Sequence, residues 1–208
     1  MTEKFPETPY TDIARYADQY FDHLTAVSKT ISSISLRQAA DILARTIDED
    51  AWVYVCGNGG STAISNHLHC DFSNGIRKST GRQLRVYSLS AQIETMTATA
   101  NDISYDDVFL HQLTGLGRPG DVLIAISSSG NSENIIRPLL WAKDHGLKTI
   151  ALTGFDGGRA KKNADISLHI DIHNYGIVED IHQSIMHILA QYIRQSMMSP
   201  EEIARQKF

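Results

Sequence analysis

The chain has 208 residues, of which 42% are hydrophobic and 21% charged, and its formal net charge is −5 at pH 7. This length and composition are typical of one globular unit with a sizeable core. The acidic balance, with no run of more than two Lys or Arg, argues against nucleic-acid binding, and no apolar segment approaches the roughly 20 residues that span a bilayer, so no membrane partner is expected.

The N-terminal stretch "MTEKFPETPYTD" has neither a basic start nor an apolar core, so it is not predicted to be a signal peptide. Cys56 and Cys70 are the only cysteines, too few for a disulfide framework, and both are interpreted as packing residues. Together these features favour a reduced, cytoplasmic protein.

Two amphipathic helices are predicted before the first strand. The first lies within residues 10–31, where apolar residues recur near helical spacing, and the second within 36–50, where Ser33 or Ser35 would be the cap. One α/β layer does not require two such helices. They therefore either pack on the sheet or dock against another copy of the chain.

From Trp52 onward, short apolar runs alternate with helical patterns. This alternation predicts βαβ units and a five-stranded parallel sheet flanked by helices, of the flavodoxin or Rossmann type. Ligands of such folds bind beyond the carboxyl ends of the strands. The predicted strands are 52–56, 84–89, 121–127, 148–154 and 166–171. "FDGG", residues 155–158, is interpreted only as the turn after the fourth of them.

Two strand-to-helix loops are candidate phosphate sites. "SSSGNS" opens one helix, and its candidate ligands are Ser127, Ser128, Ser129 and Ser132. "GNGGS" opens another, with Asn58, Gly59 and Ser61. Free backbone N–H groups at a helix start favour an anion, and serine hydroxyls add donors. Alternatively, these residues only cap helices and form turns. Neither loop matches the lysine-containing P-loop or GxGxxG, so a small phosphorylated metabolite is the favoured ligand.

Histidines and carboxylates form a second candidate site. His67 and Asp71 lie four residues apart on one predicted helix, and Glu179 and His187 lie eight apart on the last long helix. Two imidazoles and two carboxylates can hold zinc, or serve without metal as a general acid and base. The alternative is that His67 is a structural histidine. His69, His173 and His182 are further candidates for either role.

Five stretches resemble the sugar isomerase (SIS) domain family over about residues 10–195. They are "VYVCGNGGSTAISNHLHCDF", "ANDISYDDVF", "GRPGDVLIAISSSGNSENII", "AKDHGLKTIALTGFDGGRAKKNADISLHI" and "EDIHQSIMHILAQYI". The resemblance implies N-terminal helices at 1–50 that serve oligomerisation, a phosphosugar-binding unit at 51–198, and a tail at 199–208. It also implies a homotetramer with sites shared between subunits.

Among family members, the sequence is most similar to the isomerases of heptose phosphates. This similarity implies conversion of sedoheptulose 7-phosphate into D-glycero-D-manno-heptose 7-phosphate through an enediol(ate) with zinc assistance. The product is used for heptose in lipopolysaccharide or other surface polysaccharides. Asp71 would be the base and His187 the acid, with Asn101 and Asp102 near the sugar. The implied metal ligands are His67, Asp71, Glu179 and His187, and Glu179 is also placed at the substrate.

Three positions depart from the pattern of these isomerases. Asp71 stands where they have glutamate, Glu179 where they have glutamine, and Gly176 near the place of an aspartate. A second hypothesis is therefore a non-catalytic SIS protein that acts as a partner-binding adaptor or a phosphosugar sensor. The complete set of titratable side chains favours the enzyme.

Overall fold

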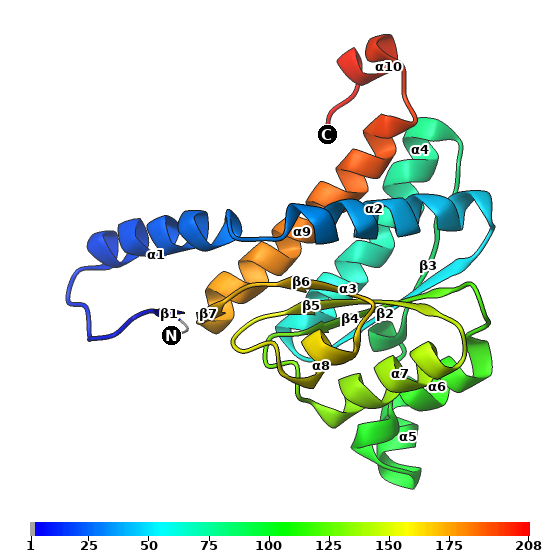
Figure 1. Ribbon diagram of the computed structural model, residues 1–208, viewed down its shortest axis with the longest axis horizontal. Coiled ribbons are helices and arrows are strands. Elements are labelled where there is room, and N and C mark those ends of the chain that lie inside the picture. Colours follow the sequence, from blue (N-terminus) through cyan, green and yellow to red (C-terminus); the bar gives the residue numbers. More distant parts are fainter. Residues whose placement is uncertain (1–2) are drawn as a thin grey trace.

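The computed structural model describes residues 3–208 and contains a five-stranded parallel sheet (Figure 1). The strand order is β3-β2-β4-β5-β6, the doubly wound order of flavodoxin-like folds. The predicted fold class is thus confirmed. The strands are β2 (Trp52–Gly57), β3 (Arg85–Ser88), β4 (Val122–Ser127), β5 (Lys148–Thr153) and β6 (Ile166–His169).

The central strands are apolar because helices cover both faces of the sheet, and every residue of β4 is buried. β4 pairs in register with β2 through Val55 and Ile124, and with β5 through Ala125 and Ala151. This register brings the carboxyl ends of the strands, and therefore the "GNGGS" and "SSSGNS" loops, to one edge of the sheet.

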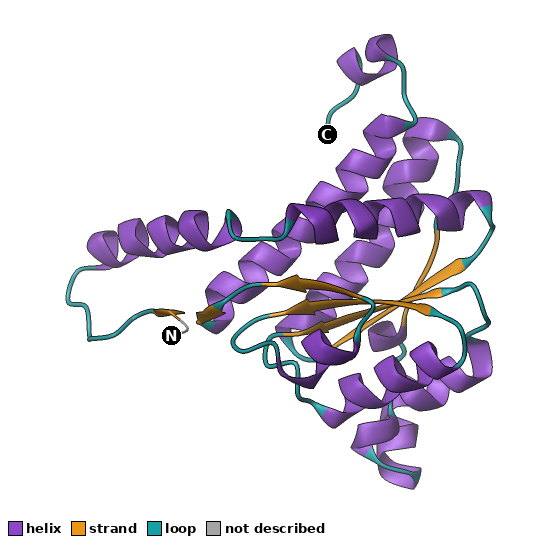
Figure 2. Cartoon of the chain, viewed as in Figure 1, coloured by secondary structure: helices purple, strands orange, loops and turns teal. Residues whose placement is uncertain are grey.

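Two helical layers sandwich the sheet (Figure 2). One contains α2 (Ser33–Asp48), α3 (Gly60–Cys70), α4 (Ile76–Thr80) and α9 (Tyr175–Ser196). The other contains α6 (Leu110–Leu116), α7 (Glu133–Asp144) and α8 (Gly158–Asn163), and α5 (Ile93–Asp102) projects beyond it. Single turns of other helix types are η1 (Asp71–Gly75, a π-helix), η2 (Leu89–Ala91) and η3 (Tyr105–Asp107).

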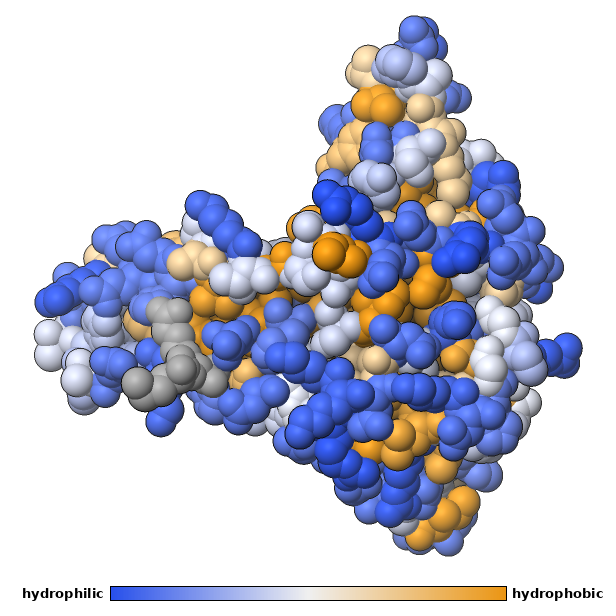
Figure 3. All heavy atoms as spheres, viewed as in Figure 1, coloured by the Kyte–Doolittle hydropathy of each residue, from blue (hydrophilic) through white to orange (hydrophobic). Residues whose placement is uncertain are grey.

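The two N-terminal helices differ in their surroundings. α2 packs on the sheet through buried Ala39 and Leu43, whereas α1 (Ile13–Ser28) extends from the body as an arm (Figure 1). The N-cap of the second helix is Ser32, not Ser33 or Ser35 as predicted. The Ser32 side chain accepts a hydrogen bond from the backbone N–H of Ser35. Figure 3 shows hydrophobic residues open to solvent where this arm meets the body.

Several small elements were not predicted from the sequence. β1 (Glu3–Lys4) pairs with β7 (Ile172–His173), and α10 (Pro200–Ala204) lies within the tail. α10 forms because Ser199 and Glu202 make a reciprocal capping box around a proline at the first turn. Within residues 3–208 we find no helix with the length and hydrophobicity needed to cross a bilayer.

Candidate active site

The serine loop, residues 127–132, connects β4 to α7. Ser127 and Ser128 are buried, and the backbone N–H of Gly130 donates to both the carbonyl and the hydroxyl of Ser127 at 3.1 Å. Ser132 is the N-cap of α7, yet its side chain makes no capping hydrogen bond. The first turn of α7 therefore presents backbone N–H groups and hydroxyls together, as an anion site requires.

The turn after β5 is hydrogen-bonded to the serine loop. The N–H of Gly154 donates to the Ser128 carbonyl at 2.9 Å, and the N–H of Ala160 donates to the Gly130 carbonyl at 2.9 Å. The N–H of Arg159 donates to the Asn131 side chain at 3.1 Å. Within the segment 155–158, predicted to be a simple turn, the carbonyl oxygen of Gly157 lies 2.0 Å from where a Cβ of Gly130 would be, so this segment also belongs to the framework of the candidate phosphate site.

The two candidate phosphate loops are joined by a pair of amides. The Asn58 and Asn134 side chains each donate to the other, at 2.9 and 2.8 Å, and the Tyr105 hydroxyl donates to Asn58 at 3.2 Å. Together the loops line a cavity of about 180 Å³. The predicted residues that line it are Asn58, Ser61, Ser127, Ser128, Ser129, Ser132 and Glu179. Gly59, between Asn58 and α3, is the N-cap of that helix and has a φ of 54°.

Glu179 points into this cavity from α9. A Cβ on Gly60 would lie 2.3 Å from a carboxylate oxygen of Glu179. The Glu179 side chain therefore fits here only because residue 60 is a glycine. Burial, and secondarily the charge of Asp180, raises the pKa of Glu179. The Tyr20 hydroxyl of α1 donates to Asp180 at 2.6 Å and lies 2.9 Å from where a Cβ of Gly176 would be. Tyr20 thus occupies the space beside Gly176, where related isomerases are expected to have an aspartate.

The structure does not bring Asn101 and Asp102 into this cavity. They end α5, where the Asn101 amide donates to the Asp102 carboxylate at 2.8 Å, and both are exposed. Asp102 lines a separate hollow with His111. Neither residue is among those that line the cavity of the phosphate loops, and the α5 helix that they end projects away from the sheet (Figure 1).

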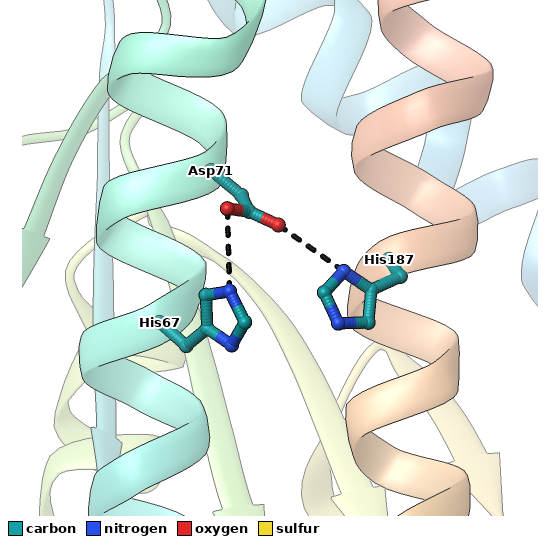
Figure 4. A group of neighbouring side chains, drawn as sticks. All are labelled: His67, Asp71 and His187. Carbon is teal, nitrogen blue, oxygen red and sulfur yellow. Dashed lines mark hydrogen bonds and ion pairs between the residues drawn. The ribbon is translucent and has the colours of Figure 1, made fainter. Parts of the chain in front are cut away.

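Three of the four predicted metal ligands do converge (Figure 4). Nε2 of His67 lies 3.4 Å from Oδ1 of Asp71, and Nδ1 of His187 lies 3.1 Å from Oδ2. One ligand atom from each of the three residues lies within 4.8 Å of the others. We call these residues the triad. Asp71 opens the π-helical turn η1, and π-turns within helices often occur at functional sites.

Glu179 lies outside this group within one chain, and its place among the metal ligands stays a prediction. It lies eight positions before His187 on α9, about 12 Å along the helix axis at 1.5 Å per residue. Gln183 lies between them, and its amide nitrogen is 3.0 Å from His67 and 2.9 Å from His187. Gln183 was not predicted, because its position one turn before His187 places it on the same stripe of α9 but does not show which side chains of α3 it faces.

The donors of the triad fit a zinc ion. Two imidazoles and one carboxylate are a common zinc set, and a fourth position would stay open for water or substrate. The triad lies beside a hollow of about 330 Å³ that Arg194 and Phe208 also line. A larger hollow of about 700 Å³ lies near Trp52 and Asp121, at the amino ends of the strands. Since parallel sheets bind ligands at the opposite edge, we assign it no role here.

Comparison with known proteins defines the class first. The model of the SIS domain matches residues 15–154, and the chain belongs to this family. More particularly, the chain is 35% identical over 177 residues to a phosphoheptose isomerase of Helicobacter pylori strain P12, covering 84% of this chain and 92% of that protein.

Solved structures agree with this placement. A phosphoheptose isomerase from Neisseria gonorrhoeae superposes with a TM-score of 0.78 at 30% identity, covering 87% of this chain and 97% of that one. One from Francisella tularensis gives a TM-score of 0.81 at 29% identity, covering 88% and 96%. The recognition made from the sequence motifs is therefore confirmed.

Proposed function

We propose that this chain is a phosphoheptose isomerase that converts sedoheptulose 7-phosphate into D-glycero-D-manno-heptose 7-phosphate. The observation that carries the proposal is the relation between the two groups of polar residues. The phosphate cavity lies at the start of α3 and α9, and the triad lies further along the same two helices. A ligand with a phosphate at one end and a carbonyl at the other matches this arrangement.

The serine loop would bind the terminal phosphate. Hydroxyls of Ser128, Ser129 and Ser132 and the N–H groups that open α7 supply donors to its oxygens. Glu179, at the cavity wall, would accept hydrogen bonds from sugar hydroxyls. Binding at this end then orients the sugar chain along α9, which places the carbonyl end at the triad.

Asp71 and His187 would exchange the protons. The Asp71 carboxylate takes a proton from the carbon next to the carbonyl, giving an enediol(ate), and His187 protonates the oxygen on which charge develops. His67 holds the other oxygen of Asp71 and limits its rotation. Zinc held by the triad would polarise the substrate oxygens when bound.

We further infer a cytoplasmic homotetramer. Its support is the exposed apolar surface of α1, which one chain leaves uncovered, and two cysteines that form no disulfide with each other. Sites shared between subunits would also give Asn101 and Asp102 a sugar to contact, because neither lines the phosphate cavity of its own chain. The product would supply heptose for surface polysaccharides.

The test is turnover of sedoheptulose 7-phosphate by the zinc-supplemented chain, with Asp71→Asn and His69→Gln compared. His69 is exposed on the same helix as His67. We expect aldose formation by the parent and by His69→Gln, and a loss of about 10²- to 10⁴-fold in Asp71→Asn, the range for a general base. Sugar phosphate that binds without turnover would contradict the isomerase. A chain that neither binds nor converts it would favour the partner-binding adaptor.

A further inference from the structure

Gln183 contacts both imidazoles of the triad on the side of each ring that faces away from Asp71. Its amide nitrogen lies 3.0 Å from Nδ1 of His67 and 2.9 Å from Nε2 of His187. The other nitrogen of each ring faces Asp71, at 3.4 and 3.1 Å respectively. Each imidazole is therefore held between a carboxylate on one side and an amide on the other, and the four side chains form a closed ring.

The amide nitrogen of Gln183 faces both rings, which fits one pair of tautomers. An amide NH₂ group has two hydrogens to donate and does not act as an acceptor, so it can donate to both rings at once. In that arrangement the ring nitrogens that face the amide are unprotonated, and each neutral imidazole carries its N–H on the side of Asp71. His187 then donates to one oxygen of Asp71 at 3.1 Å, and Nε2 of His67 lies 3.4 Å from the other.

A shared cation reverses these requirements. A neutral imidazole binds a metal through its unprotonated nitrogen and donates its other N–H to an acceptor behind it. For a cation shared with Asp71, the coordinating nitrogens are those that face the carboxylate. The nitrogens that face Gln183 then become N–H donors. A rotation of the Gln183 amide by about 180° about χ3 would bring its oxygen to face both rings. This oxygen has two lone pairs and can accept a hydrogen bond from each ring, and the rotation needs little extra space because the two ends of an amide are alike in shape.

We propose that Gln183 is a positioning residue of the metal group, whose amide orients His67 and His187 in the metal-free chain and, turned over, in the zinc-bound chain. Glu179, one turn before Gln183 on α9, lines the cavity of the serine loop. The inference rests on the proposed function only in taking zinc as the cation. Its test uses no sugar.

The experiment measures the zinc affinity of the full chain by competition with a chromophoric chelator. Gln183→Leu removes the acceptor behind both rings, and we expect its zinc Kd to rise about 10- to 100-fold, as when a partner behind a ligating histidine is lost. Gln183→Glu keeps two acceptor oxygens and should recover affinity to within about threefold of the parent. Gln195→Leu is the matched control, with zinc affinity unchanged, because Gln195 lies on the same helix and its amide donates to the carbonyl of Tyr192 at 3.2 Å.

Melting temperatures in excess chelator show whether each variant folds, and Gln183→Ala replaces Gln183→Leu if the latter does not. Parental affinity in Gln183→Leu, or a loss that Gln183→Glu does not recover, would overturn the inference. So would an equal loss in Gln195→Leu, or a parent chain that binds no zinc. A chain that shows the expected zinc pattern but fails to convert the sugar would overturn the proposed function and leave this inference standing.

Discussion

At the scale of single residues, the candidate chemistry centres on one short carboxylate. Asp71 uses both oxygens, one toward each imidazole, so its orientation is fixed by contacts with two different helices. A glutamate at this place would reach further but with one more rotatable bond. The proposed base is therefore short and held at both oxygens, and its reach is set by how closely the sugar approaches η1.

His182 is a second notable residue, because it is a completely buried histidine that the proposed chemistry does not use. Burial lowers its pKa to about 4, well below its ordinary value of 6.5. The ring is thus neutral in the folded chain and takes up a proton on unfolding below pH 6.5. This contribution to stability is fully present above that pH and is lost as the pH falls toward the folded-state pKa.

We therefore expect the free energy of unfolding to drop by about 2 kcal/mol between pH 7 and pH 5 through His182 alone. His182→Leu should remove that part of the slope, whereas His111→Gln, a change at an exposed histidine, should retain it. Urea unfolding at the two pH values measures both. Equal slopes in the parent and His182→Leu would show that this ring is not the titrating group.

At the scale of elements, the serine loop is packed directly against the turn after β5. Gly130 has φ of +64°, and a Cβ there would lie 2.0 Å from the carbonyl oxygen of Gly157. The two turns are therefore in backbone contact, and each fixes the other. This explains why a segment with no chemical group of its own, residues 155–158, is part of the site.

Gly130→Ala should lower stability and weaken substrate binding together. Gly81→Ala is the control, since Gly81 has φ of +70° but nothing within 4 Å of its Cβ position. The control should lose only the left-handed backbone cost of about 1–2 kcal/mol and keep the KM for the sugar phosphate. Gly130→Ala should lose more and raise that KM. Equal losses in the two variants would contradict the proposed contact.

The strands and long helices could be predicted from the sequence because their apolar patterns are local. The tail helix α10 was missed although its capping box is also local, since five residues give no periodicity. The pair between Asn58 and Asn134 could not be predicted, because it depends on which loops the strand order brings together. The same holds for Gln183, whose role appears only when α3 and α9 pack side by side.

At the scale of the whole molecule, the chain has a compact body and an arm with uncovered apolar side chains. On α1, Ile13 is 80% exposed and Phe21 63% exposed. Apolar surface left open on a projecting helix marks an interaction site. Its neighbour Tyr20 contacts Asp180, the residue after Glu179, so the arm is connected directly to the wall of the phosphate cavity.

Phe21→Lys should therefore reduce both assembly and activity. Light scattering coupled to size exclusion should show a tetramer for the parent and a smaller species for the variant, whose turnover should also fall. Leu116→Lys, a change at a partly exposed residue of α6 in the opposite layer, should remain a tetramer. A parent chain that is monomeric at micromolar concentration would contradict the assignment of α1 to oligomerisation.

The most direct test of the central claim, proton transfer at Asp71, is isomerisation in D₂O. The zinc-supplemented chain is incubated with sedoheptulose 7-phosphate, and the product is examined by NMR. An enediol(ate) formed at the triad predicts an aldose phosphate that carries deuterium at C2, and no such product from Asp71→Asn. An aldose that retains hydrogen at C2 would point to direct transfer between the carbons, and together with an active Asp71→Asn it would contradict the account.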